Sequence, residues 1–460
     1  MPVSPAAPPG PGFLAREWRD PQRKVFLWFA GLSLVLTLLA PAFFWALAGL
    51  SPGSHADWFP YPTENLGGAD LRATYQASAN LAQGLDIYAN DPAVGPYQDP
   101  RAGKDPLNRY SYPPPQAYLL YWLTWFDFPQ AYLVWQMATL ALIVLSLILV
   151  AKIFPAPRMA FICLSLAYWQ SSFLFFELER GQTEAPVLFC LAAMVWLMGR
   201  PGHSPFPGVF CALGTALKVT PAVFLVSFAL RRDFKNLASF ALTLAAVVLA
   251  TGPARWIYWA TKVVPYYADF MVGQGVDHSL AYFLTLFLSN WYSFKLAPLL
   301  MAGVIGLLAL GLVAHRDRDK YLLVEAAILS IVMNMGANWS ANYKLMLLPL
   351  VFLAPFSALS FPWARKRPGL FIWPLGLGLF LAVPQAGVYV LNLVLRLVPA
   401  LAAQPDLPRR FYQWLLVDTQ PRTWLQALLV SRKVPLGLII ILVWLLAQYL
   451  VSAWRSRREA

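Results

Sequence analysis

The chain has 460 residues, of which 59% are hydrophobic, 15% aromatic and 12% charged. This composition is typical of a polytopic membrane protein. The formal net charge is +13, but the basic residues fall in short clusters between apolar runs, as the positive-inside rule predicts. That distribution argues against a continuous basic surface for nucleic acid, so we expect membrane lipids and no nucleic acid among the partners.

The first apolar run, 25–50, carries no charge and exceeds the roughly 20 residues that cross a hydrocarbon layer. Because it is also longer than the core of a secretory signal, we interpret it as a retained anchor. The proline-rich residues before it, 1–24, are predicted to be a disordered cytosolic tail. The rest, 25–460, is predicted to form a single integral-membrane domain.

An all-α protein with about twelve transmembrane helices is predicted from the apolar runs. The runs lie at 25–50, 129–153, 159–176, 184–200, 205–217, 219–231, 237–254, 294–314, 321–337, 343–360, 369–395 and 433–453. An even number places both termini and the basic clusters in the cytoplasm. The longer connections then lie on the opposite face, which in a bacterial inner membrane is periplasmic.

The pair of runs over 205–231 is too short for two full crossings. We predict a broken hairpin there, with Lys218 and Pro221 near its tip. Such a break is tolerated where the irregular backbone is buried in protein or lines a cavity.

The first outer connection, 51–128, is mostly polar and is predicted to carry two interfacial helices. From Asp70 onward, Leu71, Tyr75, Leu81, Leu85 and Tyr88 recur at nearly helical spacing. We expect this helix to lie along the membrane surface with the apolar stripe down. A second interfacial helix is expected over 116–126, where Tyr and Trp residues are frequent.

Several short motifs occur in one order along the chain. They are Asp70 at the head of an outer helix that ends in Gly-Leu-Asp-Ile-Tyr, the Tyr-Ser-Tyr-Pro-Pro-Pro segment 110–115, Gly181-Gln182, Lys218-Val-Thr-Pro221, and Asn338-Trp339. Together they resemble glycosyltransferase family 87, among the C-type integral-membrane glycosyltransferases. The resemblance implies the C-type fold, a polyprenyl-phosphate sugar donor, a glycolipid or glycan acceptor, inversion at the anomeric carbon, and an acid in the first outer loop acting as base. The best-known members use polyprenyl-phosphate mannose.

Such a transfer needs a carboxylate near the acceptor hydroxyl and cations near the leaving phosphate. Asp70 is the candidate for the general base, and its alternative interpretation is a helix cap. Glu64 is a second candidate for acceptor contact, or a solvated loop charge.

For the phosphate we single out Lys218, since a lysine within an apolar run is costly unless it faces a polar cavity or an anion. Its alternative role is to extend toward the membrane surface. Arg72, His278 and Lys344 are further candidates, although Arg72 suits a lipid phosphate equally well. Arg180 is expected to pair with a neighbouring glutamate.

Polar and aromatic residues of the outer segments are candidates for contact with the sugar or the acceptor. They are Tyr110, Tyr112, Gln182, Gln274, Ser279, Asn338, Trp339 and Asn342. Two departures from the family pattern stand out. His278-Ser279 replaces an Asn-Gln-Ser-like stretch, and Ala341 or Asn342 stands where the family frequently has a histidine.

No cluster with metal-ligand spacing and no nucleotide-binding motif is present in the sequence, so we expect no metal and no cofactor. The principal alternative function is a transporter or flippase for a polyprenyl-linked or other glycolipid, because many spans with intramembrane polar groups also suit transport. A third is an inactive relative that binds a polyprenyl lipid. The long first outer loop favours the enzyme.

Overall fold

The structure is a computed structural model that describes residues 69–88, 110–153, 177–178, 180–200, 204–265, 279–315, 321–336, 374 and 433–458. Within these ranges the regular structure is helical. The longer helices are α3 (Ala69–Ala82), α5 (Phe128–Ile153), α8 (Glu184–Met198), α9 (Phe206–Leu217), α11 (Phe234–Thr251), α15 (Asn290–Ala314), α16 (Leu322–Met335) and α24 (Lys433–Arg458). The short elements are α4 (Pro115–Leu119), η2 (Tyr121–Trp125), η3 (Thr220–Phe224), α10 (Leu225–Leu230), α12 (Pro253–Tyr258), η4 (Trp259–Val263) and α14 (Leu280–Leu284).

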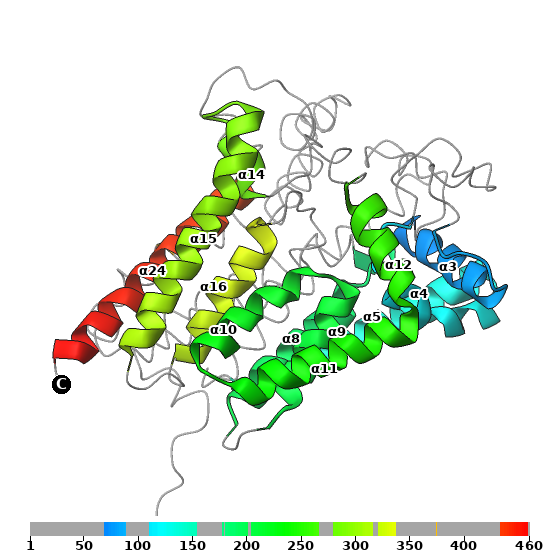
Figure 1. The fold of residues 1–460 in the computed structure, drawn as a ribbon, viewed down its shortest axis with the longest axis horizontal. Helices are drawn as coiled ribbons and strands as arrows, with labels where there is room; N and C mark the ends of the chain where they lie inside the picture. The colour runs from blue at the N-terminus through cyan, green and yellow to red at the C-terminus, as the bar shows by residue number, and fades with distance from the viewer. Residues whose placement is uncertain are drawn as a thin grey trace, which may run out of the picture.

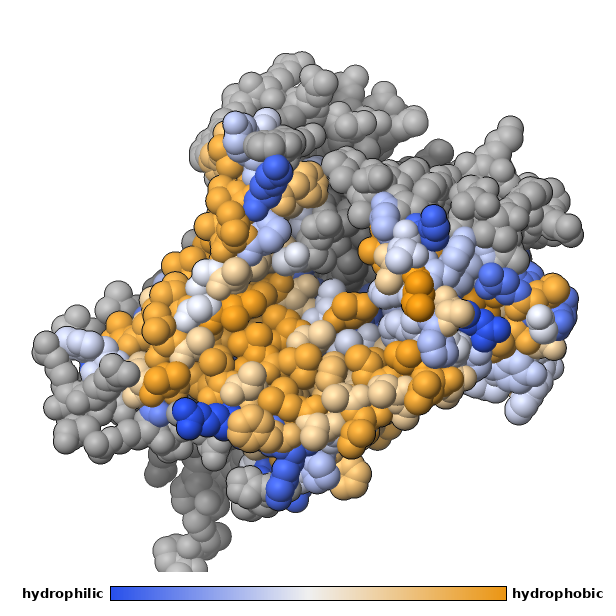
Figure 2. All heavy atoms as spheres, in the orientation of Figure 1, coloured by the Kyte–Doolittle hydropathy of each residue, from blue (hydrophilic) through white to orange (hydrophobic). Residues whose placement is uncertain are grey.

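Four of the described helices are long and apolar enough to cross a membrane, at Phe128–Val150, Phe234–Thr251, Tyr292–Ala314 and Pro435–Arg455. Large hydrophobic side chains are exposed on α11 and α15, among them Leu242, Leu249, Leu299 and Leu310. Figure 2 shows hydrophobic residues over much of the face in view. The prediction of a helical membrane protein is therefore confirmed. The number of twelve spans stays a prediction, since 25–50, 159–176, 343–360 and 369–395 lie outside the described residues.

Most of the longer helices pack around one large apolar core, while α3, α4, η2 and η4 contribute to two smaller buried clusters. On one side α5 lies beside α8, α8 beside α9, and α9 beside α11; on the other, α15 and α16 pack against α24 (Figure 1). Contacts of α16 with α8 and η3, and of α10 with α15, join the two groups. The described part is therefore one packed bundle.

The helix break predicted near Lys218 is present. Helix α9 ends at Leu217, Lys218 is extended (φ −145°, ψ 123°), and the chain resumes as the η3 turn with a proline in its first positions. Pro221 favours the break, because it has no N–H to donate to the Leu217 carbonyl and its ring would clash with that carbonyl in a continuous helix. The Leu217 carbonyl, left without a helical partner, accepts a hydrogen bond from Gln116 Nε2 at 2.9 Å.

The described part of the first outer loop departs from the predicted interfacial arrangement. Because helix α3 packs on α4 and η2, part of its apolar stripe faces protein and not the membrane surface. Leu71 and Tyr88 are fully buried, whereas Leu85 is 50% exposed. The helix ends before Gly84, whose positive φ of 71° terminates it. The second predicted helix, 116–126, is present as the short pieces α4 and η2.

Candidate functional site

A tight turn before α8 carries the centre of the site. Gly181 has a φ of 65°, and a Cβ built on it would lie 2.6 Å from Cβ of Leu71 in α3. Glycine is therefore needed for both the backbone conformation and the close approach of α3. From α5, Tyr132 donates to the Leu178 carbonyl at 3.0 Å and Trp135 Nε1 to the Gln182 carbonyl at 3.1 Å. The turn is thus held between two helices.

Asp70 lies in the first turn of α3, which begins at Ala69, and its side chain is 11% exposed. The carboxylate forms an ion pair with Arg180, whose Nη1 lies 3.3 Å from Oδ2 and 3.4 Å from Oδ1. Gln182 Nε2 also donates a hydrogen bond to Oδ2. The ion pair between Arg180 and Asp70 of α3 was not predicted, because we expected Arg180 to pair with a neighbouring glutamate.

The other end of the Gln182 amide faces a cation. Its Oε1 accepts from the Tyr112 hydroxyl at 2.8 Å and from Lys218 Nζ at 3.3 Å. Lys218 forms an ion pair with Glu184 at the start of α8, and its ammonium lies 4.9 Å from the centre of the Tyr112 ring. The helix break therefore places the lysine among polar and aromatic partners rather than in lipid.

Two buried carboxyl groups, those of Glu177 and Glu184, lie close to Lys218. Glu177 and Glu184 are both fully buried, and Glu177 Oε1 accepts from the Ala185 backbone at 3.1 Å. Burial, followed by the charge of Glu184, raises the pKa of Glu177 well above its ordinary value. The remaining oxygen of each group has no hydrogen-bond partner among the described residues.

We call this set the Asp70–Lys218 cluster. Its members are Asp70, Tyr112, Glu177, Arg180, Gln182, Glu184 and Lys218. It offers a partly accessible carboxylate and a partly accessible ammonium that one amide connects.

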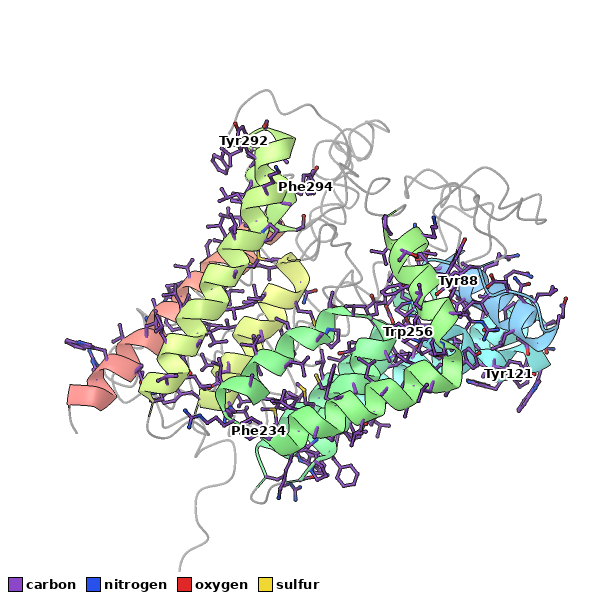
Figure 3. The ribbon with its side chains drawn as sticks, in the orientation of Figure 1. Tyr88, Tyr121, Phe234, Trp256, Tyr292 and Phe294 are labelled. Carbon is purple, nitrogen blue, oxygen red and sulfur yellow. The ribbon has the colours of Figure 1, made fainter. Side chains whose placement is uncertain are left out.

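A group of tyrosines adjoins the cluster, at the end of the molecule where Figure 3 labels Tyr88 and Trp256. The Tyr88 hydroxyl donates to the Tyr112 carbonyl at 2.8 Å, and the rings of Tyr88 and Tyr258 of α12 lie 5.6 Å apart. Burial raises the pKa of Tyr88 and that of Tyr110. Both therefore stay protonated as donors and support the segment that carries Tyr112.

The structure brings some predicted site residues together and separates others. Asp70, Tyr112, Gln182 and Lys218 share the Asp70–Lys218 cluster, and Tyr110 lies beside it with its ring 6.0 Å from that of Tyr112. Arg72 places its guanidinium 4.2 Å from the centre of the Phe128 ring, and the buried Ser279 hydroxyl accepts from the Tyr282 backbone as the cap of α14. Seven candidates lie outside the described residues, namely Glu64, Gln274, His278, Asn338, Trp339, Asn342 and Lys344.

Three members of the cluster had no predicted role at the site. They are Glu177, Glu184 and, as a partner of Asp70, Arg180. The available signal was the density of charge in 177–184, four ionisable side chains immediately before an apolar run. Charges so close to a span are expected to be paired.

Residues 110–337 match the model of glycosyltransferase family 87. Over this segment the chain belongs to that family. It is also 32% identical, over 167 residues, to the polyprenol-phosphate-mannose-dependent alpha-(1-2)-phosphatidylinositol mannoside mannosyltransferase of Mycobacterium tuberculosis. That similarity covers 33% of this chain and 39% of the relative, so well under half of the relative's length is matched. No solved structure matches the chain.

The family segment contains most of the cluster. Tyr112, the turn 177–183, Glu184 and Lys218 lie inside it, whereas α3 and Asp70 precede it. The assignment of Asp70 to the family site therefore depends on the contacts of Asp70 with Arg180 and Gln182, which connect α3 to the matched segment.

Proposed function

We propose that this protein is a membrane glycosyltransferase that moves a sugar, mannose or another hexose or pentose, from a polyprenyl-phosphate donor to a glycolipid or glycan acceptor. The reaction takes place at the periplasmic face and inverts the anomeric carbon. The observation that carries the proposal is the Asp70–Lys218 cluster, where one amide connects a carboxylate to an ammonium in a chain of glycosyltransferase family 87. The mannose-dependent relative supports the donor class.

Asp70 serves as the general base. The acceptor oxygen forms a bond to the anomeric carbon on the face opposite the phosphate, and the hydroxyl proton passes to Asp70. The bond from the anomeric carbon to the phosphate oxygen breaks, and the electron pair leaves with the polyprenyl phosphate. Oδ1 of Asp70 is the oxygen for this task, because Oδ2 already accepts from Gln182 and Arg180.

Lys218 stabilises the leaving phosphate. It reaches the site because the helix breaks at this residue, and its side chain is 11% exposed. The Lys218–Glu184 ion pair keeps the ammonium in place when no donor is bound. The apolar exposed faces of the bundle suit the polyprenyl tail.

The test is sugar transfer by the purified protein from synthetic polyprenyl-phosphate sugars to a panel of glycolipids and glycans, with Asp70→Asn beside the wild type. A general base contributes roughly 10²–10⁴-fold to the rate, so we expect Asp70→Asn to lose at least about 100-fold in turnover. Folding and donor binding should stay near those of the wild type. A folded Asp70→Asn protein with normal turnover would refute the role of Asp70.

A lipid transporter or flippase is the second candidate, and the break at Lys218 favours it. Broken helices with a charged residue at the break are a feature of transporter binding sites. Reconstitution in liposomes with a labelled polyprenyl-phosphate sugar distinguishes the two. Movement of the label between leaflets without sugar transfer supports the transporter.

A further inference from the structure

Gln182 uses both atoms of its side-chain amide inside the Asp70–Lys218 cluster. Nε2 donates to Asp70, and Oε1 accepts from Lys218 and from the Tyr112 hydroxyl. A carboxylate only accepts hydrogen bonds and an ammonium only donates them. The amide therefore satisfies both neighbours in one orientation, and the opposite orientation would set donor against donor at Lys218 and acceptor against acceptor at Asp70.

We propose that Gln182 is a positioning residue that couples the Asp70 carboxylate to the Lys218 ammonium, and that it acts on the sugar only through them. The inference rests on the proposed function, since it takes Asp70 as the base and Lys218 as the phosphate ligand. It replaces the interpretation of Gln182 as a sugar contact.

The surroundings of Gln182 fit a positioning role. The residue is 2% exposed, its carbonyl accepts from Trp135, and its backbone N–H donates to the Glu177 carbonyl at 3.0 Å. The side chain is thus held at its base by a helix and a turn, and at its tip by two charged groups. Three of the four hydrogen-bonding positions of this buried amide are engaged with the cluster, which leaves one N–H for a substrate hydroxyl.

The side-chain type also follows from the geometry. Glutamate at this position would keep the bond from Lys218 but place a second negative charge against Asp70. Methionine has a similar length and loses both bonds. Asparagine is one methylene shorter and cannot span the two groups from the same backbone position.

The coupling fixes which oxygen of Asp70 is available. Gln182 and Arg180 both bond Oδ2, while Oδ1 has the longer 3.4 Å contact with Arg180 Nη1. Loss of the amide frees the carboxylate to rotate. Turnover should therefore fall more than substrate binding, because near-attack geometry is lost.

The kinetic test compares Gln182→Met and Gln182→Glu with the wild type, using synthetic polyprenyl-phosphate mannose and an acceptor that the wild type uses. We expect kcat to fall about 10–100-fold with the acceptor KM changed less than threefold. Gln182→Glu should lower kcat further, because the new carboxylate faces that of Asp70.

Gln116→Met is the matched control. Gln116 is also a fully buried glutamine, and its Nε2 bonds the Leu217 carbonyl rather than Asp70. Its kcat should fall less than that of Gln182→Met, because the contacts of Asp70 are unchanged. A raised acceptor KM in Gln182→Met with an unchanged kcat would overturn the proposal in favour of a sugar contact.

A double-mutant cycle of thermal stability tests the coupling between Asp70 and Lys218 without any transfer assay. The shifts in Tm caused by Asp70→Asn and by Lys218→Met should be non-additive when Gln182 is present and additive in a Gln182→Met background. Additive shifts in both backgrounds would overturn the coupling. If the wild type transfers no sugar while the cycle shows the coupling, the proposed function fails and the structural link stands.

Discussion

Two buried ion pairs flank the segment that follows the helix break, and they differ in how completely their carboxylate oxygens accept hydrogen bonds. Lys218 precedes this segment and pairs with Glu184, whereas Arg231 follows it and pairs with Glu325 at 2.9 Å. Both pairs lie among apolar helices, where an unpaired charge is costly. Their surroundings, however, suit different tasks.

Around Glu325 both carboxylate oxygens are occupied. Oε2 accepts from Arg231 and, at 3.5 Å, from Ser227, while Oε1 accepts from the Tyr449 hydroxyl of α24 at 3.1 Å. Tyr449 is fully buried and also packs against Gly311 and the ring of His315. This set, the Arg231–Glu325 cluster, joins α10, α15, α16 and α24 and therefore stabilises the packing of the last helix.

Around Lys218 some carboxylate oxygens accept no hydrogen bond. Glu177 and Glu184 each keep one oxygen without a hydrogen-bond partner among the described residues, and the Asp70 side chain remains partly accessible. Buried polar atoms in folded proteins are nearly always satisfied, and exceptions concentrate at functional sites. We infer that the Arg231–Glu325 cluster serves folding, and the open carboxylate oxygens around Lys218 fit the proposed function of the Asp70–Lys218 cluster.

The largest expected effect is on stability, from Glu325→Leu. Removing one partner of a buried ion pair costs about 3–5 kcal/mol, because the remaining charge stays buried without compensation. We expect a strongly lowered Tm in detergent and a reduced yield of folded protein. The donor KM of the protein that does fold should match that of the wild type.

The double variant Arg231→Met/Glu325→Leu is the control for Glu325→Leu. It removes both charges, so most of the lost stability should return. If the double variant is as unstable as the single one, the pair does not act as a unit, and the contrast with Lys218 fails.

The next effect is on binding, from Lys218→Ala. A hydrogen bond to a charged group contributes about 1.5–3 kcal/mol, which corresponds to roughly 10–100-fold in the Kd of the donor lipid. We expect that loss in a binding assay with the intact polyprenyl-phosphate sugar. Lys152→Ala is the matched control, since this lysine ends α5 and lies 5.9 Å from the Trp196 ring, away from the cluster. Equal donor affinity in Lys218→Ala and the wild type would remove Lys218 from the donor site.

The sequence predicted the local features of the site better than its contacts. The break near Lys218 was predictable because Pro221 cannot continue the hydrogen bonds of the preceding helical turn, and the start of α3 near Asp70 followed from helical spacing. The pairing of Asp70 with Arg180 was not predictable, because it depends on how closely α3 approaches Gly181. The role of Gln182 was equally hidden, since an amide has the same appearance in sequence whether it contacts a sugar or two charged side chains.

The smallest effect is a change in the pH dependence of stability, from Glu177→Gln. Burial and the charge of Glu184 raise the pKa of Glu177 in the folded protein. The folded state then holds a proton that the unfolded state releases, so stability is fully present below the ordinary pKa of glutamate. It is lost as the pH rises through the raised value.

Glutamine has no proton to lose and resembles the protonated form of Glu177. We therefore expect the Tm of the wild type to decline more steeply than that of Glu177→Gln as the pH rises above the ordinary pKa of glutamate, with the two values closest at the acid end. Thermal unfolding in detergent at several pH values measures the difference. Parallel declines would mean that Glu177 is ionised in the folded protein. The Asp70–Lys218 cluster would then carry one more negative charge, and Lys218 would be less available to a phosphate than the comparison with the Arg231–Glu325 cluster implies.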